Sequence, residues 1–141
     1  TYDIPYRSIY RVHQRVAKTF RQGRIMLAGD AAHVNNPLGG MGLNSGIHDA
    51  MNLADKLARV LQDDAGDALL DLYDRQRRIT NVDYLQAITI RNKKMLEERD
   101  PQVRAQRLDE MRETAADPEK HRAFLMNSSM INSVRRAAQI D

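Results

Sequence analysis

The most regular feature of the sequence is a run of apolar residues at three- and four-residue steps between positions 43 and 61. This spacing places one apolar stripe along a helix of 3.6 residues per turn, so it predicts a long amphipathic helix, whose stripe ordinarily faces a core. The stripe consists of Leu43, Ile47, Ala50, Leu53, Ala54, Leu57, Ala58 and Leu61. Residues 63–66, Asp-Asp-Ala-Gly, break the pattern and end the helix.

A second helical pattern fills the rest of the chain. Asp67 is placed to cap a helix. The stripe of that helix consists of Leu70, Tyr73, Arg77, Thr80, Tyr84 and Ile88. Two Asp-Pro pairs follow, at Asp100 and Asp117, and each has the pattern of an N-cap followed by proline at the first helical position. Residues 67–141 are therefore predicted to be almost entirely helical.

Strand patterns are confined to the first 30 residues. Residues 8–17 alternate between two faces, which suits a strand at the margin of a sheet. Residues 24–28, Arg-Ile-Met-Leu-Ala, form a short apolar run before Gly29 and Asp30, as in a buried parallel strand. The chain is thus predicted to be mainly α with two short strands.

Composition narrows the class of protein. Apolar residues make up 42% and charged residues 29% of the chain, which is typical of a globular protein. Two Phe and no Trp predict an aliphatic, Met-rich core. The absence of Cys excludes disulfides, thiolate metal sites and a cysteine nucleophile, and we predict no metal site. No apolar run approaches the ~20 residues of a membrane span, and we expect a cytoplasmic protein.

The net charge of +3 does not indicate a nucleic-acid-binding protein. The surplus lies in residues 1–30, whereas basic and acidic residues are interleaved in residues 91–141, as on a solvated helical face. No aromatic residues alternate with the basic ones to provide a stacking surface for bases. We therefore expect no nucleic acid among the partners.

The chemistry is concentrated where the strand at 24–28 gives way to the helix at 43. Gly29 permits a close backbone approach beside Asp30, whose ionised carboxylate accepts hydrogen bonds from ligand hydroxyls. Four glycines within residues 39–46 allow positive φ angles and remove side chains that would obstruct a flat ligand. The free N–H groups at the start of the next helix carry partial positive charge and favour an anion or an electron-rich carbonyl.

Other glycine-loop motifs fit less well. Residues 40–46 have three residues before the last glycine and so miss the dinucleotide fingerprint by one position, and a Walker loop would need Gly-Lys-Ser/Thr. A purely structural turn remains the simple alternative. We expect His33 to form local hydrogen bonds, and Asp49 to act through the dipole at the first turns of its helix.

The order of these motifs resembles the second FAD motif of the class A aromatic hydroxylases, the para-hydroxybenzoate hydroxylase type. The elements are Gly29-Asp30-Ala31-Ala32-His33, then Pro37, then Gly39-Gly40-Met41-Gly42-Leu43-Asn44, then Asp49-Ala50-Met51-Asn52-Leu53. Residues 11–15 and 23–24 also look like this family, so the resemblance covers about residues 10–61. It implies an enzyme that uses FAD, NADH or NADPH, and O₂ to hydroxylate a phenolic or aromatic acid substrate.

The resemblance also implies the binding residues. Gly29 and Asp30 would hold the ribityl chain, with Asp30 bonding its hydroxyls. Pro37 would lie beside the flavin ring and the substrate, and the backbone of Gly39, Gly40 and Gly42 would pass along the ring. Leu43 and Asn44 would offer N–H groups to the pyrimidine carbonyl next to N1. No catalytic residue is assigned.

The family's ADP-binding βαβ unit has no counterpart in the sequence, so we interpret the chain as a C-terminal fragment. Residues 1–61 would be the end of a glutathione-reductase-like α/β FAD-binding domain, and residues 62–141 a C-terminal helical region. We expect the isolated fragment to be inactive and not to retain FAD. The strand at 24–28 would have a free edge, which favours a homo-oligomer.

Two alternatives remain open from the sequence. The chain could be a stand-alone helical interaction module with a relic flavin loop, or part of another flavoprotein of this fold, such as a halogenase or an epoxidase. A glycine-rich βαβ unit in the reading frame upstream of Thr1 would favour the enzyme.

Overall fold

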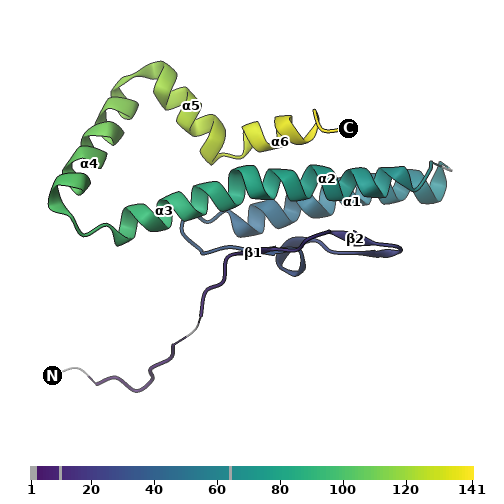
Figure 1. The fold of residues 1–141 in the computed structure, drawn as a ribbon, viewed down its shortest axis with the longest axis horizontal. Coiled ribbons are helices and arrows are strands. Elements are labelled where there is room, and N and C mark those ends of the chain that lie inside the picture. Colours follow the sequence, from purple (N-terminus) through teal and green to yellow (C-terminus); the bar gives the residue numbers. More distant parts are fainter. Residues whose placement is uncertain (1–2, 10, 64) are drawn as a thin grey trace.

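The computed structural model describes residues 3–9, 11–63 and 65–141, and these are mainly helical (Figure 1). The α-helices are α1 (Gly42–Gln62), α2 (Ala68–Thr80), α3 (Ala87–Glu97), α4 (Pro101–Ala116), α5 (Pro118–Ser128) and α6 (Ile131–Ala137). The strands, of two residues each, are β1 (Arg15–Val16), β2 (Arg21–Gln22), β3 (Ile25–Met26) and β4 (His33–Val34). The predicted long helices near 43 and 67 are confirmed.

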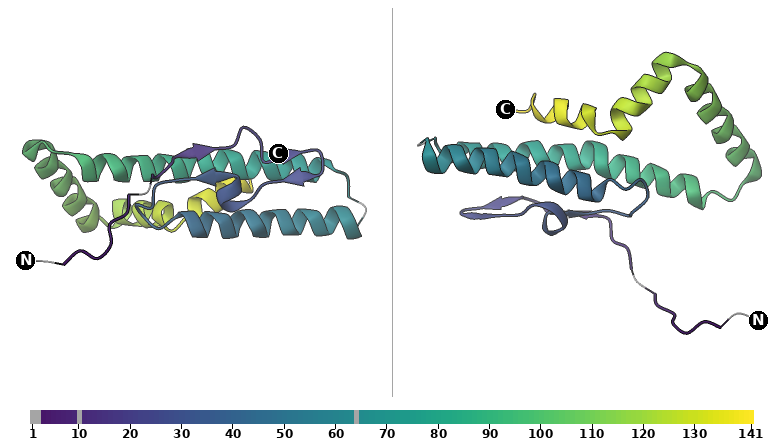
Figure 2. Two further views of the ribbon diagram at one scale, coloured as in Figure 1. Left: turned by 90° about the horizontal axis from the view of Figure 1, so that it is seen from below. Right: turned by 180° about the vertical axis from the view of Figure 1, so that it is seen from behind.

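The longest element is a continuous rod made of α2, a π-helical turn η2 (Asn81–Gln86) and α3. Helix α1 runs beside α2, and the strands lie against the same helix pair (Figures 1 and 2). Beyond α3 the chain turns through α4 and α5, and α6 returns to α2. Residues 3–9 extend away from this body (Figure 2), and they are exposed.

The strands differ from their prediction. Within residues 8–17, only Arg15 and Val16 form a strand, which pairs antiparallel with β4, and Tyr10 lies outside the described residues. Residues 25–26 form an antiparallel hairpin with β2 around Gly23, not a buried parallel strand. Ile25 is 69% exposed, and β3 has β2 as its only pairing partner among the described residues.

Helix α1 turns its polar side toward the rest of the described chain. Ser45, Asp49 and Lys56 are its buried residues, whereas Leu43 and Leu61 of the apolar stripe are 78% and 76% exposed. Much of the apolar stripe is therefore exposed, although Leu53 packs against the core cluster of Phe20, Ala32 and Tyr73. The polar side can be buried because its groups are hydrogen-bonded to α2 and η2.

The core consists of two small clusters. One is built on Phe20, Ala32 and Tyr73 and is therefore partly aromatic, against the prediction of an aliphatic core. The other contains Met41, Leu85 and Met130 and matches the predicted Met-rich character. Both clusters include residues of the α2–η2–α3 rod, so this rod is the central packing element of the described chain.

The helix ends test the predicted caps. Asp100 and Asp117 each accept hydrogen bonds from the next two free backbone N–H groups, with proline at the first helical position, as predicted. Asp67 does not cap α2 with its side chain, because that carboxylate pairs with Arg21 at 2.7 Å. Among the described residues, no helix is long and apolar enough to cross a membrane.

Candidate flavin site and the buried network behind it

The Gly-Asp motif forms a tight turn directly after the β2–β3 hairpin. Gly29 has φ +59°, a conformation that glycine adopts without strain, and it begins the short 3₁₀ turn Gly29–Ala31. A Cβ atom at Gly46 would lie 3.4 Å from the Gly29 Cα, so the turn packs closely on α1. Asp30 is exposed, and its carboxylate is free to meet a ligand.

The glycine loop has the backbone freedom that the sequence predicts. Gly39 and Gly40 have φ +112° and +63°. A Cβ at Gly39 would lie 2.9 Å from the amide nitrogen of Asn92, and one at Gly42 would lie 3.1 Å from Oδ1 of Asn35. Side chains at these positions would therefore collide with the residues that support the loop.

A surface hollow of about 340 Å³ joins the two motifs. It is lined by Asp30, Val34, Asn35, Pro37, Gly40, Met41, Gly42 and Leu43. Five of the eight predicted binding residues are thus brought to one place. The other three do not line it. Gly29 precedes Asp30, and Gly39 lies against Asn92. Asn44 lies on the exposed first turn of α1, where its side-chain amide donates to the Gly40 carbonyl at 3.3 Å.

The N-terminus of α1 is directed by this loop. The helix begins at Gly42, and Ser45 is the first residue whose N–H bonds back, to the Met41 carbonyl at 3.0 Å. The N–H groups of the first turn have no partners within a helix, and they give this end of α1 a partial positive charge. Met41, to which the sequence assigned no role, is 4% exposed and anchors the loop in the second core cluster.

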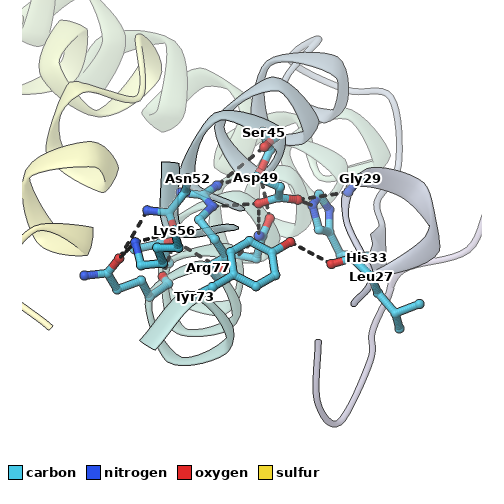
Figure 3. Close-up of polar contacts among 12 residues, drawn as sticks. Leu27, Gly29, His33, Ser45, Asp49, Asn52, Lys56, Tyr73 and Arg77 are labelled. Atoms are coloured by element: carbon cyan, nitrogen blue, oxygen red, sulfur yellow. Dashed lines mark hydrogen bonds and ion pairs between the residues drawn. The ribbon is translucent and has the colours of Figure 1, made fainter. Parts of the chain in front are cut away.

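Behind the hollow lies a buried ionic network centred on Asp49 (Figure 3). One carboxylate oxygen of Asp49 accepts from the Gly29 N–H at 3.0 Å and lies 2.7 Å from Nε2 of His33. The other oxygen accepts from Nε of Arg77 at 2.6 Å and from the Asn81 amide at 3.4 Å. Asp49 is fully buried, so it links α1 to the Gly-Asp turn and to α2 without contact with solvent.

The electrostatics of Asp49 follow from these partners. Burial by itself raises the pKa of the carboxyl group, but the His33 hydrogen bond and the Arg77 guanidinium outweigh it and hold the pKa of Asp49 below its usual value. Asp49 is thus a buried, ionised carboxylate. The expectation that it acts only through the helix dipole is wrong, because the carboxylate is directed at His33 and Arg77.

Of the histidines, His33 forms a buried hydrogen bond, but its partner is Asp49, 16 residues away, and not a local group as expected. His13 and His121 are exposed, and His48 is half-buried on α1. The Asp49 network was not predicted from the sequence. Two signals could have indicated it: the polar stripe on α1 and the arginine within the stripe of the second helix.

A second polar cluster lies further along α1. The Lys56 ammonium donates to Asn52 and to Gln76 at 2.9 Å each, and it is only 6% exposed. Burial lowers the pKa of Lys56. The cluster lies on the α6 side of the α1–α2 pair, where it lines another hollow with residues of α6, including Val134 and Ala137.

Comparison with known proteins identifies the family. Residues 1–87 match the family model described as FAD binding domain. The chain is 37% identical over 134 residues to a para-nitrophenol 4-monooxygenase from Pseudomonas sp. (strain WBC-3), covering 95% of the chain and 33% of that protein. It is 55% identical over 76 residues to a 3-(3-hydroxy-phenyl)propionate/3-hydroxycinnamic acid hydroxylase from Mycolicibacterium smegmatis, covering 54% of the chain and 14% of that protein.

Solved structures agree. The crystal structure of p-nitrophenol 4-monooxygenase from Pseudomonas putida DLL-E4 superimposes with a TM-score of 0.81 at 38% identity, covering 87% of this chain and 32% of that one. The anhydrotetracycline hydroxylase of Streptomyces rimosus gives a TM-score of 0.68 at 36% identity, covering 82% of this chain and 23% of that one. The chain belongs to the FAD-binding family of class A aromatic hydroxylases and spans about a third or less of the length of these relatives.

Proposed function

We propose that the protein carrying this chain is an FAD-dependent monooxygenase that hydroxylates an aromatic ring, and that this chain supplies its ribityl- and ring-binding loop. One observation carries the proposal. The exposed carboxylate of Asp30, the backbone of Gly40 and Gly42 and the N-terminus of α1 surround a single hollow. A carboxylate suits the hydroxyl groups of the ribityl chain, a glycine backbone suits the flat flavin ring, and a helix N-terminus suits the electron-rich edge of that ring.

The residues present fit the cofactor. Asp30 would accept from ribityl hydroxyls, the Gly39–Gly42 backbone would lie along the ring, and the N–H groups of Leu43 and Asn44 would meet the pyrimidine edge. Glycine is required at 39, where φ is +112° and a Cβ would lie 2.9 Å from the Asn92 amide, and a Cβ at 42 would crowd Asn35. When bound, FAD supplies the redox chemistry, with NADH or NADPH as reductant and O₂ as oxygen source. Pro37 would border the ring and the substrate.

The names of the relatives support a substrate class. The para-nitrophenol enzyme and the 3-(3-hydroxy-phenyl)propionate enzyme are both named for single-ring phenols. We therefore propose a single-ring phenolic or aromatic acid substrate. We also propose that a glutathione-reductase-like FAD domain ends near residue 61 and that a helical region follows it. The protein would be cytoplasmic and would form a homo-oligomer through the edge of β3.

FAD affinity of the full-length protein tests the site. A hydrogen bond from a ligand hydroxyl to a charged group contributes roughly 1.5–3 kcal/mol, so Asp30→Ala should weaken FAD binding by about 10- to 150-fold. Asp109→Ala is the control, because Asp109 is an exposed α4 residue paired with Arg112. Unchanged FAD affinity in Asp30→Ala would contradict the site. Stimulation of NAD(P)H oxidation by a panel of single-ring phenols tests the reaction.

A further inference from the structure

The α2–η2–α3 rod holds the segment before the glycine loop through a regular set of polar contacts. Three residues at three-residue steps on the rod meet every second residue of the segment 34–38: Gln86 and Asn92 through their side-chain amides, and Thr89 through its backbone carbonyl. The Gln86 amide donates to the Val34 carbonyl at 3.2 Å. The Asn92 amide donates to the Leu38 carbonyl at 3.1 Å.

The central contact of this set is the most buried. The Asn36 amide donates to the Thr89 carbonyl at 3.0 Å and to the Gln14 amide oxygen at 2.6 Å. Gln14 in turn donates to the Thr89 hydroxyl at 2.7 Å. Asn36 is 4% exposed and Thr89 is fully buried, so a broken contact here would leave a polar group without water.

The π-helical turn η2 explains why the rod reaches both α1 and the loop. Before it, Arg77 and Asn81 are directed at Ser45 and Asp49 on α1. In an uninterrupted α-helix, nine residues advance about 900°, so Gln86 would lie about 180° from Arg77. A π-bulge adds one residue to a turn and shifts the following face by about 100°. The shift turns Gln86 and Thr89 toward the loop side.

The glycine at position 39 fits the same arrangement. The amide nitrogen of Asn92 occupies the place next to Gly39 where a Cβ atom would lie 2.9 Å away. The same amide group bonds the carbonyl of the preceding Leu38. The close approach of α3 to the loop thus depends both on Asn92 and on the absence of a side chain at 39.

We propose that the side-chain amides of Gln86 and Asn92 and the backbone carbonyl of Thr89, directed toward the loop by the π-helical turn, form a clamp that fixes Pro37 and the glycines after it in the position that receives the flavin ring. The proposal rests on the proposed function for the identity of the ligand. The clamp itself concerns only residues of this chain, and its residues are positioning residues, since none of them lines the hollow.

Hydrogen–deuterium exchange on the full-length protein without FAD tests the clamp. The Leu38 N–H bonds to Oδ1 of Asn36, and the Gly40 N–H bonds to the Pro37 carbonyl, so both amides report on the loop. In Asn92→Leu we expect exchange in the peptide spanning residues 34–42 to be roughly tenfold faster, the factor that loss of one hydrogen bond allows. Gln86→Leu, which removes the bond to the Val34 carbonyl, should have the same effect.

Asn52→Leu is the matched control. Asn52 is also a half-buried helical asparagine, but its amide bonds Gln76 and Lys56 in the second polar cluster. It should leave exchange at residues 34–42 unchanged even if it lowers Tm as much as Asn92→Leu does. Equal exchange at 34–42 in the two variants would overturn the clamp.

A deletion tests the role of the π-helical turn. Removing Val82, which is 48% exposed, would restore an α-helical turn with eight residues from Arg77 to Gln86, and eight residues advance about 800°, the same orientation that the π-bulge gives to nine. We therefore expect unchanged helix content and unchanged exchange at 34–42, and faster exchange would overturn the part assigned to the turn. FAD binding is then measured for the wild type and each variant. Failure of the wild type to bind FAD would contradict the proposed function, but it would not change the conclusion from the exchange experiment.

Discussion

The carboxylate of Asp49 accepts a hydrogen bond from the backbone N–H of Gly29 at 3.0 Å, across 20 residues of sequence. The bond ties helix α1 to the turn that presents Asp30. The same carboxylate is neutralised by Arg77 on α2, so three elements meet at one buried charge. The position of the Asp30 carboxylate therefore depends on an ion pair that does not line the hollow.

Replacing Asp49 by Asn should be strongly destabilising. The substitution keeps the shape of the side chain but leaves the Arg77 guanidinium buried without its counter-charge. Removing one partner of a buried ion pair costs about 3–5 kcal/mol. We expect the free energy of unfolding of the full-length protein to fall by that amount. Chemical denaturation followed by far-UV circular dichroism measures it.

Asp109→Asn is the control for that measurement. Asp109 and Arg112 form an ion pair whose side chains are 66% and 77% exposed. Exposed pairs contribute at most about 1 kcal/mol, so this variant should unfold close to wild type. Equal losses in Asp49→Asn and Asp109→Asn would show that the Asp49 network is not an important source of stability.

The same carboxylate should make stability depend on acid pH. The pKa of Asp49 is lower in the folded chain than in the unfolded one, so the unfolded state binds the proton more readily. Its contribution is therefore present above about pH 4, the usual aspartate pKa, and is lost as the pH falls through the folded value. Asp117, whose pKa is lowered by backbone N–H groups, acts in the same direction.

The difference between two variants isolates Asp49. Free energies of unfolding measured between pH 7 and pH 3 should fall less steeply for Asp49→Asn than for wild type, because the variant lacks the titrating group. An equally steep fall in both proteins would assign the acid sensitivity to other carboxylates, Asp117 among them.

Much of the helical structure was predictable because it depends on local sequence. The caps at Asp100 and Asp117 follow from side-chain bonds to N–H groups two and three residues away, and both are present. Asp67 also precedes a helix, although Ala68 and not proline follows it, and Arg21, 46 residues away, takes its carboxylate. Local propensity does not include such a competitor, which is why this cap was predicted wrongly.

The site was predictable in part. Glycine spacing indicated the loop, and the positive φ angles of Gly39 and Gly40 confirm its backbone conformation. Which side of α1 is buried was not predictable from the apolar period, because the polar side becomes buried only when Arg77 meets Asp49. The π-helical turn gave no sequence signal, because it changes the face of the rod and not its helical character.

Tyr73 provides a test of the first core cluster. Its hydroxyl donates to the Leu27 carbonyl at 2.6 Å, at the end of the strand that leads into Gly29. Burial and the nearby Asp49 raise the pKa of Tyr73, so the hydroxyl stays protonated and remains a donor. Tyr73→Phe leaves that carbonyl unsatisfied, which costs about 1–3 kcal/mol. Thermal unfolding measures the loss, and Tyr6→Phe, at a side chain 80% exposed, should leave Tm unchanged.

The last prediction concerns the N–H groups at the start of α1. Gly42 is the first residue of the helix, and proline there removes one N–H that has no partner within the helix. Flavin reduction adds negative charge at the edge that these groups would face, so they should favour the reduced form. Loss of about 1 kcal/mol of this preference lowers the two-electron midpoint potential by about 20 mV.

Gly42→Ala separates this electrostatic effect from crowding. Alanine places a Cβ 3.1 Å from Oδ1 of Asn35, as proline does, but it keeps the N–H. Proline also disfavours the helical conformation of Met41, so far-UV circular dichroism must show that α1 is retained. Potentiometric titration of the FAD-loaded full-length protein should give a lower midpoint for Gly42→Pro than for both wild type and Gly42→Ala. An unchanged or higher midpoint with FAD bound would mean that the helix does not point at the flavin edge.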